Sequence, residues 1–210
     1  MRESMEWTHC ESWEGEIKVL AVGDSIVWGA RNRIRSVLGD KYGLTTVVSA
    51  HGVNEEKFIK SVSVLATLDD DGYEVVYFNN GLHMRGQNAD EYEMNYRNAL
   101  GELMKAIPAK RWILGLSTPV SNKQTDKWDD TAPISEQHIK SLEKTNELVG
   151  EYNKRVKLIA KELGLKYYDA YELLDGRDDL KVDPYHYNDE GKMLFAKAVG
   201  ACIIEEMKNI

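Results

Sequence analysis

Apolar residues gather in five short runs along the chain, and each run is followed by a stretch with apolar positions every three or four residues. Short runs rich in β-branched and aromatic residues predict strands, and the longer spacing predicts helices. The expected strands span residues 17–22, 45–48, 74–78, 112–116 and 166–168. The expected helices span residues 28–39, 54–68, 88–106, 135–163 and 189–208.

Alternation of strands and helices predicts a parallel sheet, because each helical crossover returns the chain to the same end of the sheet. We therefore expect an α/β fold with a five-stranded parallel sheet between two helical layers, a three-layer α/β/α domain. The 210 residues fit one domain with a sizeable core. Residues 17–210 are expected to form that domain. Residues 1–16, which include Trp7 and Trp13, are expected to be an N-terminal extension that packs on its body.

Charge and hydropathy narrow the possible partners and the compartment. The net charge of -8 and the lack of a basic stripe argue against a nucleic-acid partner. No apolar run approaches the roughly 20 residues of a membrane span, and the first residues lack the apolar core of a signal peptide. The cytoplasm is therefore the expected compartment, or the exterior if a signal once preceded this chain.

Two short blocks bring together the residues of a nucleophilic site. Gly23-Asp24-Ser25 directly follows the first expected strand, and Asp183-x-x-His186 precedes the last expected helix. A serine hydroxyl needs an imidazole to accept its proton, and the imidazole needs a carboxylate to fix its tautomer. The blocks thus predict Ser25 as nucleophile, His186 as base and Asp183 as orienting acid.

Each of these residues also has a plainer interpretation. Ser25 alone would usually be a helix cap, and Asp183 with His186 is also compatible with a surface loop pair or half of a metal site. The presence of both blocks favours the nucleophile, and the other histidines lack metal-ligand spacing, so no metal is expected. Neither a P-loop nor a GxGxxG motif follows the first strand, so no cofactor is expected.

These blocks resemble those of the SGNH (GDSL-type) hydrolases, a family of esterases, lipases and thioesterases. Gly52 matches the glycine of that family's second block. The third block, Gly-x-Asn-Asp in the family, departs: His83 takes the asparagine position and Met84 the aspartate position, with Asn80 just upstream. The resemblance implies the flavodoxin-like strand order 2-1-3-4-5. It also implies an oxyanion hole formed by the Ser25 and Gly52 N–H groups with either Asn80 or His83, and we lean slightly to Asn80.

The resemblance implies a serine hydrolase acting on a small-molecule ester. Trp28 and Tyr185 flank the motif blocks, and Trp128 lies in the loop after the fourth expected strand. We expect these three aromatic residues to bind substrate. They favour a short acyl group, such as acetyl, on a small polar or carbohydrate alcohol. A thioesterase, a lysophospholipase or an acyltransferase on the same three residues is the alternative. A non-catalytic binding domain that keeps the fold is another, since the third block is altered.

Overall fold

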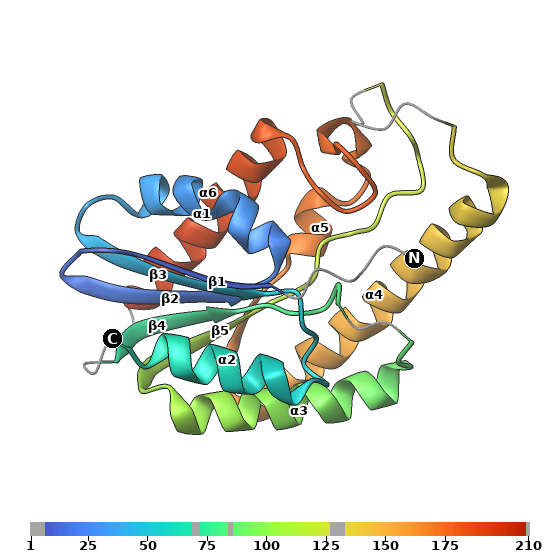
Figure 1. Cartoon of the computed structure of the whole chain (residues 1–210). Coiled ribbons are helices and arrows are strands. Elements are labelled where there is room, and N and C mark those ends of the chain that lie inside the picture. Colours follow the sequence, from blue (N-terminus) through green and yellow to red (C-terminus); the bar gives the residue numbers. More distant parts are fainter. Residues whose placement is uncertain (1–6, 69–71, 84–85, 127–132, 209–210) are drawn as a thin grey trace.

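The structure is a computed structural model, and it describes residues 7–68, 72–83, 86–126 and 133–208 (Figure 1). Six strands form one sheet in the order β1-β3-β2-β4-β5-β6. All neighbouring strands are parallel except β1 and β3, which are antiparallel. The strands are β1 Thr8–Trp13, β2 Ile17–Gly23, β3 Tyr42–Ser49, β4 Tyr73–Phe78, β5 Ala109–Gly115 and β6 Lys166–Tyr168.

Five of these strands confirm the expected parallel sheet. Numbered from β2 onward, their spatial order β3-β2-β4-β5-β6 is the predicted 2-1-3-4-5. The expected strand count is corrected from five to six, because Thr8–Trp13 adds the edge strand β1. Periodicity missed β1 because polar groups help hold it: Ser12 Oγ donates to Thr45 Oγ1 at 3.1 Å. The division of the chain at residue 16 remains a prediction.

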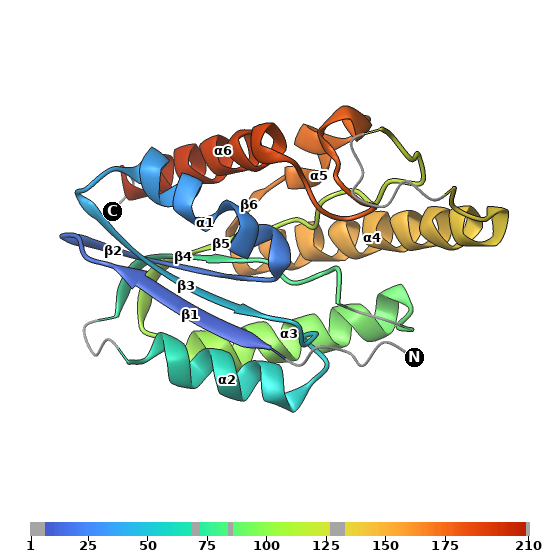
Figure 2. The same cartoon turned by 45° about the horizontal axis from the view of Figure 1, so that its top comes forward.

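Helices cover both faces of the sheet (Figures 1 and 2). One face carries α1 Ser25–Leu38, α5 Ala170–Leu174 and α6 Asp189–Met207, and the other carries α2 Glu56–Ala66, α3 Ala89–Ala106 and α4 Glu136–Leu163. The five long helices lie where they were expected. The short helix α5 and the 3-10 turn Asp178–Leu180 were not predicted, since each is too brief for helical periodicity to show.

The central strand β2 shows why the sheet is buried on both sides. Its residues point alternately to opposite faces, so Leu20 and Val22 join the core under α2 and α3, while Val19 and Ala21 join the core under α1 and α6. All four side chains are fully buried. A strand covered on both faces has a continuous apolar run, as the sequence shows at these positions.

The parallel strands share one carboxyl edge, where the loops after β2, β3, β4 and β5 begin. The sequence motifs fall in these loops and in the loop before α6. Within the described residues, no helix is long and apolar enough to cross a bilayer.

Candidate active site

Ser25 is the first residue of α1, and one residue, Asp24, separates it from the end of β2. Asp24 caps the helix, and its Oδ1 accepts a hydrogen bond from the Ile26 N–H at 2.9 Å. Gly23 allows the tight turn, since a Cβ at this position would lie 2.3 Å from Cγ2 of Val27. The strand-to-helix turn therefore places the Ser25 hydroxyl at the positive end of the helix dipole, where an anion is stabilised.

The structure brings the predicted serine, histidine and aspartate side chains together. Ser25 Oγ lies 2.8 Å from His186 Nε2, and Asp183 Oδ2 lies 2.6 Å from His186 Nδ1. With the ring proton on Nδ1, His186 donates to Asp183 and accepts from the Ser25 hydroxyl. Burial on its own would raise the pKa of Asp183, but hydrogen bonds from the His186 side chain and from two backbone N–H groups lower that pKa to about 2.

The loop that carries Asp183 and His186 is closed at its base. Lys181 and Tyr187 form an antiparallel bridge, and Val182 N–H donates to His186 O at 3.0 Å. Inside the loop, Lys181 Nζ donates to Pro119 O at 2.7 Å and to Tyr185 O at 3.2 Å. The same ammonium lies 3.8 Å from the centre of the Tyr187 ring. This lysine, with 1% of its surface exposed, thus ties the motif loop to the loop after β5.

Lys181 makes the stability of the fold depend on pH. Burial lowers the pKa of its ammonium to about 7. The nearby carboxylates of Asp183 and Asp178 favour the charged form and act in the opposite direction. Between about pH 7 and pH 10.5, the unfolded chain therefore binds more protons than the folded chain. The Lys181 contribution to stability rises with pH across that window. We expect the wild type to gain several kcal/mol over Lys181→Met there, because each pKa unit is worth about 1.4 kcal/mol. Urea unfolding of both proteins at pH 6.5 and 9.5 measures the difference between their unfolding free energies. A difference that is the same at both pH values contradicts the expectation.

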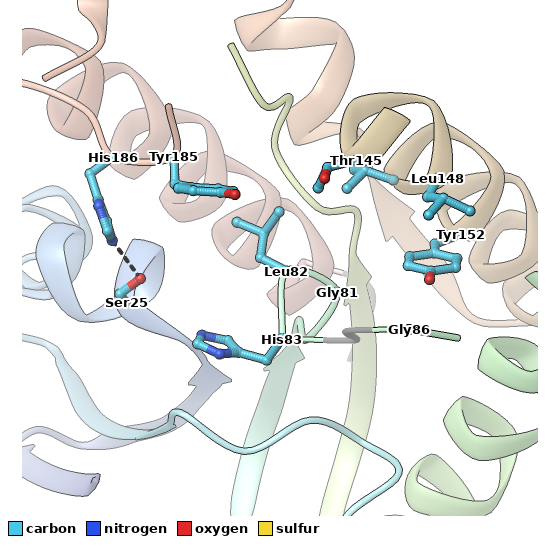
Figure 3. A pocket seen from close by; sticks show the side chains of 11 residues that line it. Ser25, Gly81, Leu82, His83, Gly86, Thr145, Leu148, Tyr152, Tyr185 and His186 are labelled. Atoms are coloured by element: carbon cyan, nitrogen blue, oxygen red, sulfur yellow. Dashed lines mark hydrogen bonds between the residues drawn. The ribbon is translucent and has the colours of Figure 1, made fainter. Parts of the chain in front are cut away.

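A cavity of about 470 Å³ opens beside Ser25 and His186. Figure 3 shows Leu82 and His83 reaching into it from the loop after β4, and Thr145, Leu148 and Tyr152 facing them from α4. Tyr152 stacks on Tyr92 with ring centroids 4.1 Å apart, and its hydroxyl donates to Gln87 O at 2.5 Å. These two contacts fix the position of Tyr152 in the α4 wall of the cavity. None of the described residues that line this cavity is Asp, Glu, Lys or Arg.

Asn80 and His83, the two side-chain candidates for the oxyanion hole, lie in different surroundings. Asn80 has 1% of its surface exposed, and its Nδ2 donates to His51 O at 2.9 Å. His83 lines the cavity, and its ring extends toward Ser25 (Figure 3). The geometry therefore favours His83, against our slight preference for Asn80 from the sequence.

Gly52 follows β3 as expected, but its N–H has a partner. It donates to Glu55 Oε1 at 2.8 Å, and the other oxygen of that carboxylate lies 2.9 Å from His51 Nδ1. The role predicted for Gly52 needs an N–H that points at substrate. This structure therefore does not support Gly52 as an oxyanion donor unless the Glu55 carboxylate moves.

Of the three aromatic residues expected to bind substrate, only Tyr185 lines the described cavity. The ring of Trp28 stacks on His9 at a centroid distance of 5.0 Å, and the Arg31 guanidinium lies 3.5 Å from its centre. These contacts occupy the Trp28 ring, so the structure does not support its expected role. Trp128 lies outside the described residues.

Sequence reasoning missed the α4 wall of the cavity and the buried Lys181. Thr145, Leu148 and Tyr152 carry only the ordinary apolar spacing of a helix, so nothing in the sequence marks them as cavity residues. Lys181 lies two residues before Asp183, and a lysine in a polar loop is usually exposed. Among the described residues, no group of three or more His, Cys, Asp or Glu side chains gathers as a metal site would need.

Comparison by sequence finds no matching protein-family model and no matching curated protein. Comparison of structures does find similar proteins. A lipolytic protein of the G-D-S-L family from Veillonella parvula has a TM-score of 0.66 at 17% identity, covering 90% of this chain and 97% of that one. An aryl esterase from M. smegmatis has a TM-score of 0.69 at 12% identity, with 90% and 99% covered.

A carbohydrate acetylesterase from Sinorhizobium meliloti has a TM-score of 0.60 at 18% identity, and covers 90% of this chain and 99% of that one. Identities this low establish the fold alone. Each similar protein is matched over nearly its whole length, so the likeness covers a complete domain. The chain therefore has the SGNH (GDSL-type) hydrolase fold.

Proposed function

We propose that the protein is a serine esterase that hydrolyses a short-chain acyl ester of a small polar or carbohydrate alcohol. The observation that carries this proposal is the continuous hydrogen-bonded chain from Ser25 through His186 to Asp183. It lies at the N-terminus of α1 and beside a cavity of a size suited to a small ligand. A hydroxyl in such a chain is a prepared nucleophile.

The reaction takes two acyl-transfer steps. Ser25 Oγ attacks the carbonyl carbon while His186 Nε2 takes the hydroxyl proton, and the negative oxygen is stabilised by the Ser25 N–H and the His83 ring. The bond to the alcohol oxygen then breaks, and His186 returns its proton to that oxygen. A water molecule attacks the acyl-enzyme with His186 as base, the bond to Ser25 Oγ breaks, and the acid leaves while the serine regains its proton.

Two features support a small, uncharged substrate. The described cavity walls carry no Asp, Glu, Lys or Arg side chain, so these walls offer no ion pair to a phosphate or an ammonium of a substrate. Tyr185 offers an aromatic face on which an apolar or sugar ring can pack. The similar fold of a carbohydrate acetylesterase adds support for the class of substrate.

Hydrolysis of p-nitrophenyl acetate, measured from pH 4 to 9, tests this proposal. We expect kcat/KM to be lowest at the acidic end of this range and to level off toward the alkaline end, because an imidazolium cannot accept the Ser25 proton. Asp183, with its pKa lowered to about 2, is ionised throughout and adds no second step. A flat profile contradicts an imidazole base. A folded protein with no turnover supports the alternative of a non-catalytic binding domain.

A further inference from the structure

A second and much smaller cavity adjoins the same two reactive side chains. Its volume is about 20 Å³, and Ser25 and His186 line both it and the cavity of about 470 Å³. The small cavity lies between α1 and α6, and its other walls are Ile26, Gly29, Ala30, Tyr187, Lys192 and Phe195. An ester carbonyl placed at Ser25 thus has two spaces of very different size for its two substituents.

The small cavity is apolar, and three of its lining residues are packed in the core. Ala30, Tyr187 and Phe195 are each at most 2% exposed and belong to the core between α1, α6 and the sheet. Closely packed interiors resist the insertion of even one methylene group. So small a space favours a methyl group over a longer acyl chain.

Gly29 and Lys192 control the remaining room. A Cβ added at Gly29 would lie 3.4 Å from Lys192 Cε, an ordinary contact that the lysine stem can accommodate. The Lys192 side chain is 32% exposed, and its Nζ lies 3.8 Å from Asp189. One wall of the small cavity is therefore formed by the methylene stem of a partly exposed lysine, and this wall can be shortened without touching the core.

We propose that the small cavity is the acyl subsite and accepts the methyl group of an acetyl ester, while the large cavity receives the alcohol. This assignment rests on the esterase function proposed above. It deepens that function by naming the substrate class: an acetyl ester of an alcohol much larger than the acetyl group. The alcohol lies against Leu148, Tyr152 and Tyr185, and the leaving oxygen stays within reach of His186, which lines both cavities.

The reverse arrangement does not fit the volumes. An alcohol of ring size cannot enter a space of about 20 Å³, and an acetyl methyl group alone would leave most of the cavity of about 470 Å³ unused. The substituents are thus sorted by size.

A pair of variants tests the acyl subsite in opposite directions. Gly29→Ala adds a methyl group to the small cavity, and we expect kcat/KM for p-nitrophenyl acetate to fall about tenfold or more. Lys192→Ala shortens a wall, and we expect the butyrate-to-acetate ratio of kcat/KM to rise about tenfold. Gly101→Ala is the matched control, because a Cβ there meets nothing within 4 Å and Gly101 lies on α3 away from both cavities. It should leave every rate unchanged.

The substrate series separates failure of this inference from failure of the esterase function. The wild type should prefer acetate over butyrate and octanoate by about tenfold or more, and should tolerate large changes of the alcohol. A preference for octanoate, or variants with the wild-type acyl profile, overturns the acyl subsite although ester hydrolysis stands. A wild type that hydrolyses none of the esters overturns both the proposed function and the acyl subsite.

Discussion

Replacement of Ser25 by alanine should lower kcat/KM for p-nitrophenyl acetate by at least about 10⁴-fold. The variant lacks the oxygen that forms the acyl-enzyme, and among the described residues no other hydroxyl bonds to His186 Nε2. The protein should remain folded, because Ser25 Oγ contributes one partly buried hydrogen bond and the cap of α1 is Asp24. Steady-state kinetics and circular dichroism measure the two outcomes.

The matched control for this variant is Ser63→Ala on α2. The Ser63 carbonyl accepts from Thr67, and alanine keeps that carbonyl. Activity within twofold of the wild type is expected for Ser63→Ala. If Ser25→Ala were folded and retained near-normal turnover, Ser25 would not be the nucleophile.

The second large effect is expected at His83. Loss of one preorganised donor to an oxyanion typically costs about 10²–10³ in kcat. Since His83 lines the cavity beside Ser25, His83→Ala should lower kcat by about that factor with little change in KM. His83→Asn should recover part of the loss, because an amide N–H can replace the ring N–H.

Asn80→Ala is the informative comparison for His83→Ala. The Asn80 amide is already bonded to His51 O in the interior, so its loss should cost about 1–3 kcal/mol of stability and only a few-fold in kcat. A large loss of kcat for Asn80→Ala with a mild effect of His83→Ala would reverse the assignment. Mild effects of both would leave the oxyanion hole to backbone groups alone.

The fold was largely predictable because its central strands are continuous apolar runs, each followed by a helix. The apolar runs at β2 and β4 are buried on both faces, so they show clearly in the sequence, and the helix after each run fixes the parallel pairing. The edge strand β1 was missed. It exposes one side and pairs partly through the hydroxyls of Thr8 and Ser12, which leave no apolar period.

In the candidate site, the sequence predicted the meeting of three side chains but not their surroundings. Ser25, Asp183 and His186 fall in short motifs that the strand ends and the last helix carry to one edge of the sheet. The sequence could not show whether the Gly52 N–H is free to donate to a substrate, because its hydrogen bond to Glu55 depends on the conformation of that side chain. The stacking of Trp28 on His9 was not predictable either, since His9 comes from the unexpected β1.

Covalent labelling tests the central claim, that Ser25 is an activated nucleophile, most directly. The wild type is treated with a fluorophosphonate, and intact mass and peptide mapping locate the adduct. One equivalent on Ser25 is predicted, with no adduct on Ser25→Ala and much slower labelling of His186→Ala, because His186 accepts the hydroxyl proton. A folded wild type that takes up no label, or an adduct on another residue, would contradict the claim.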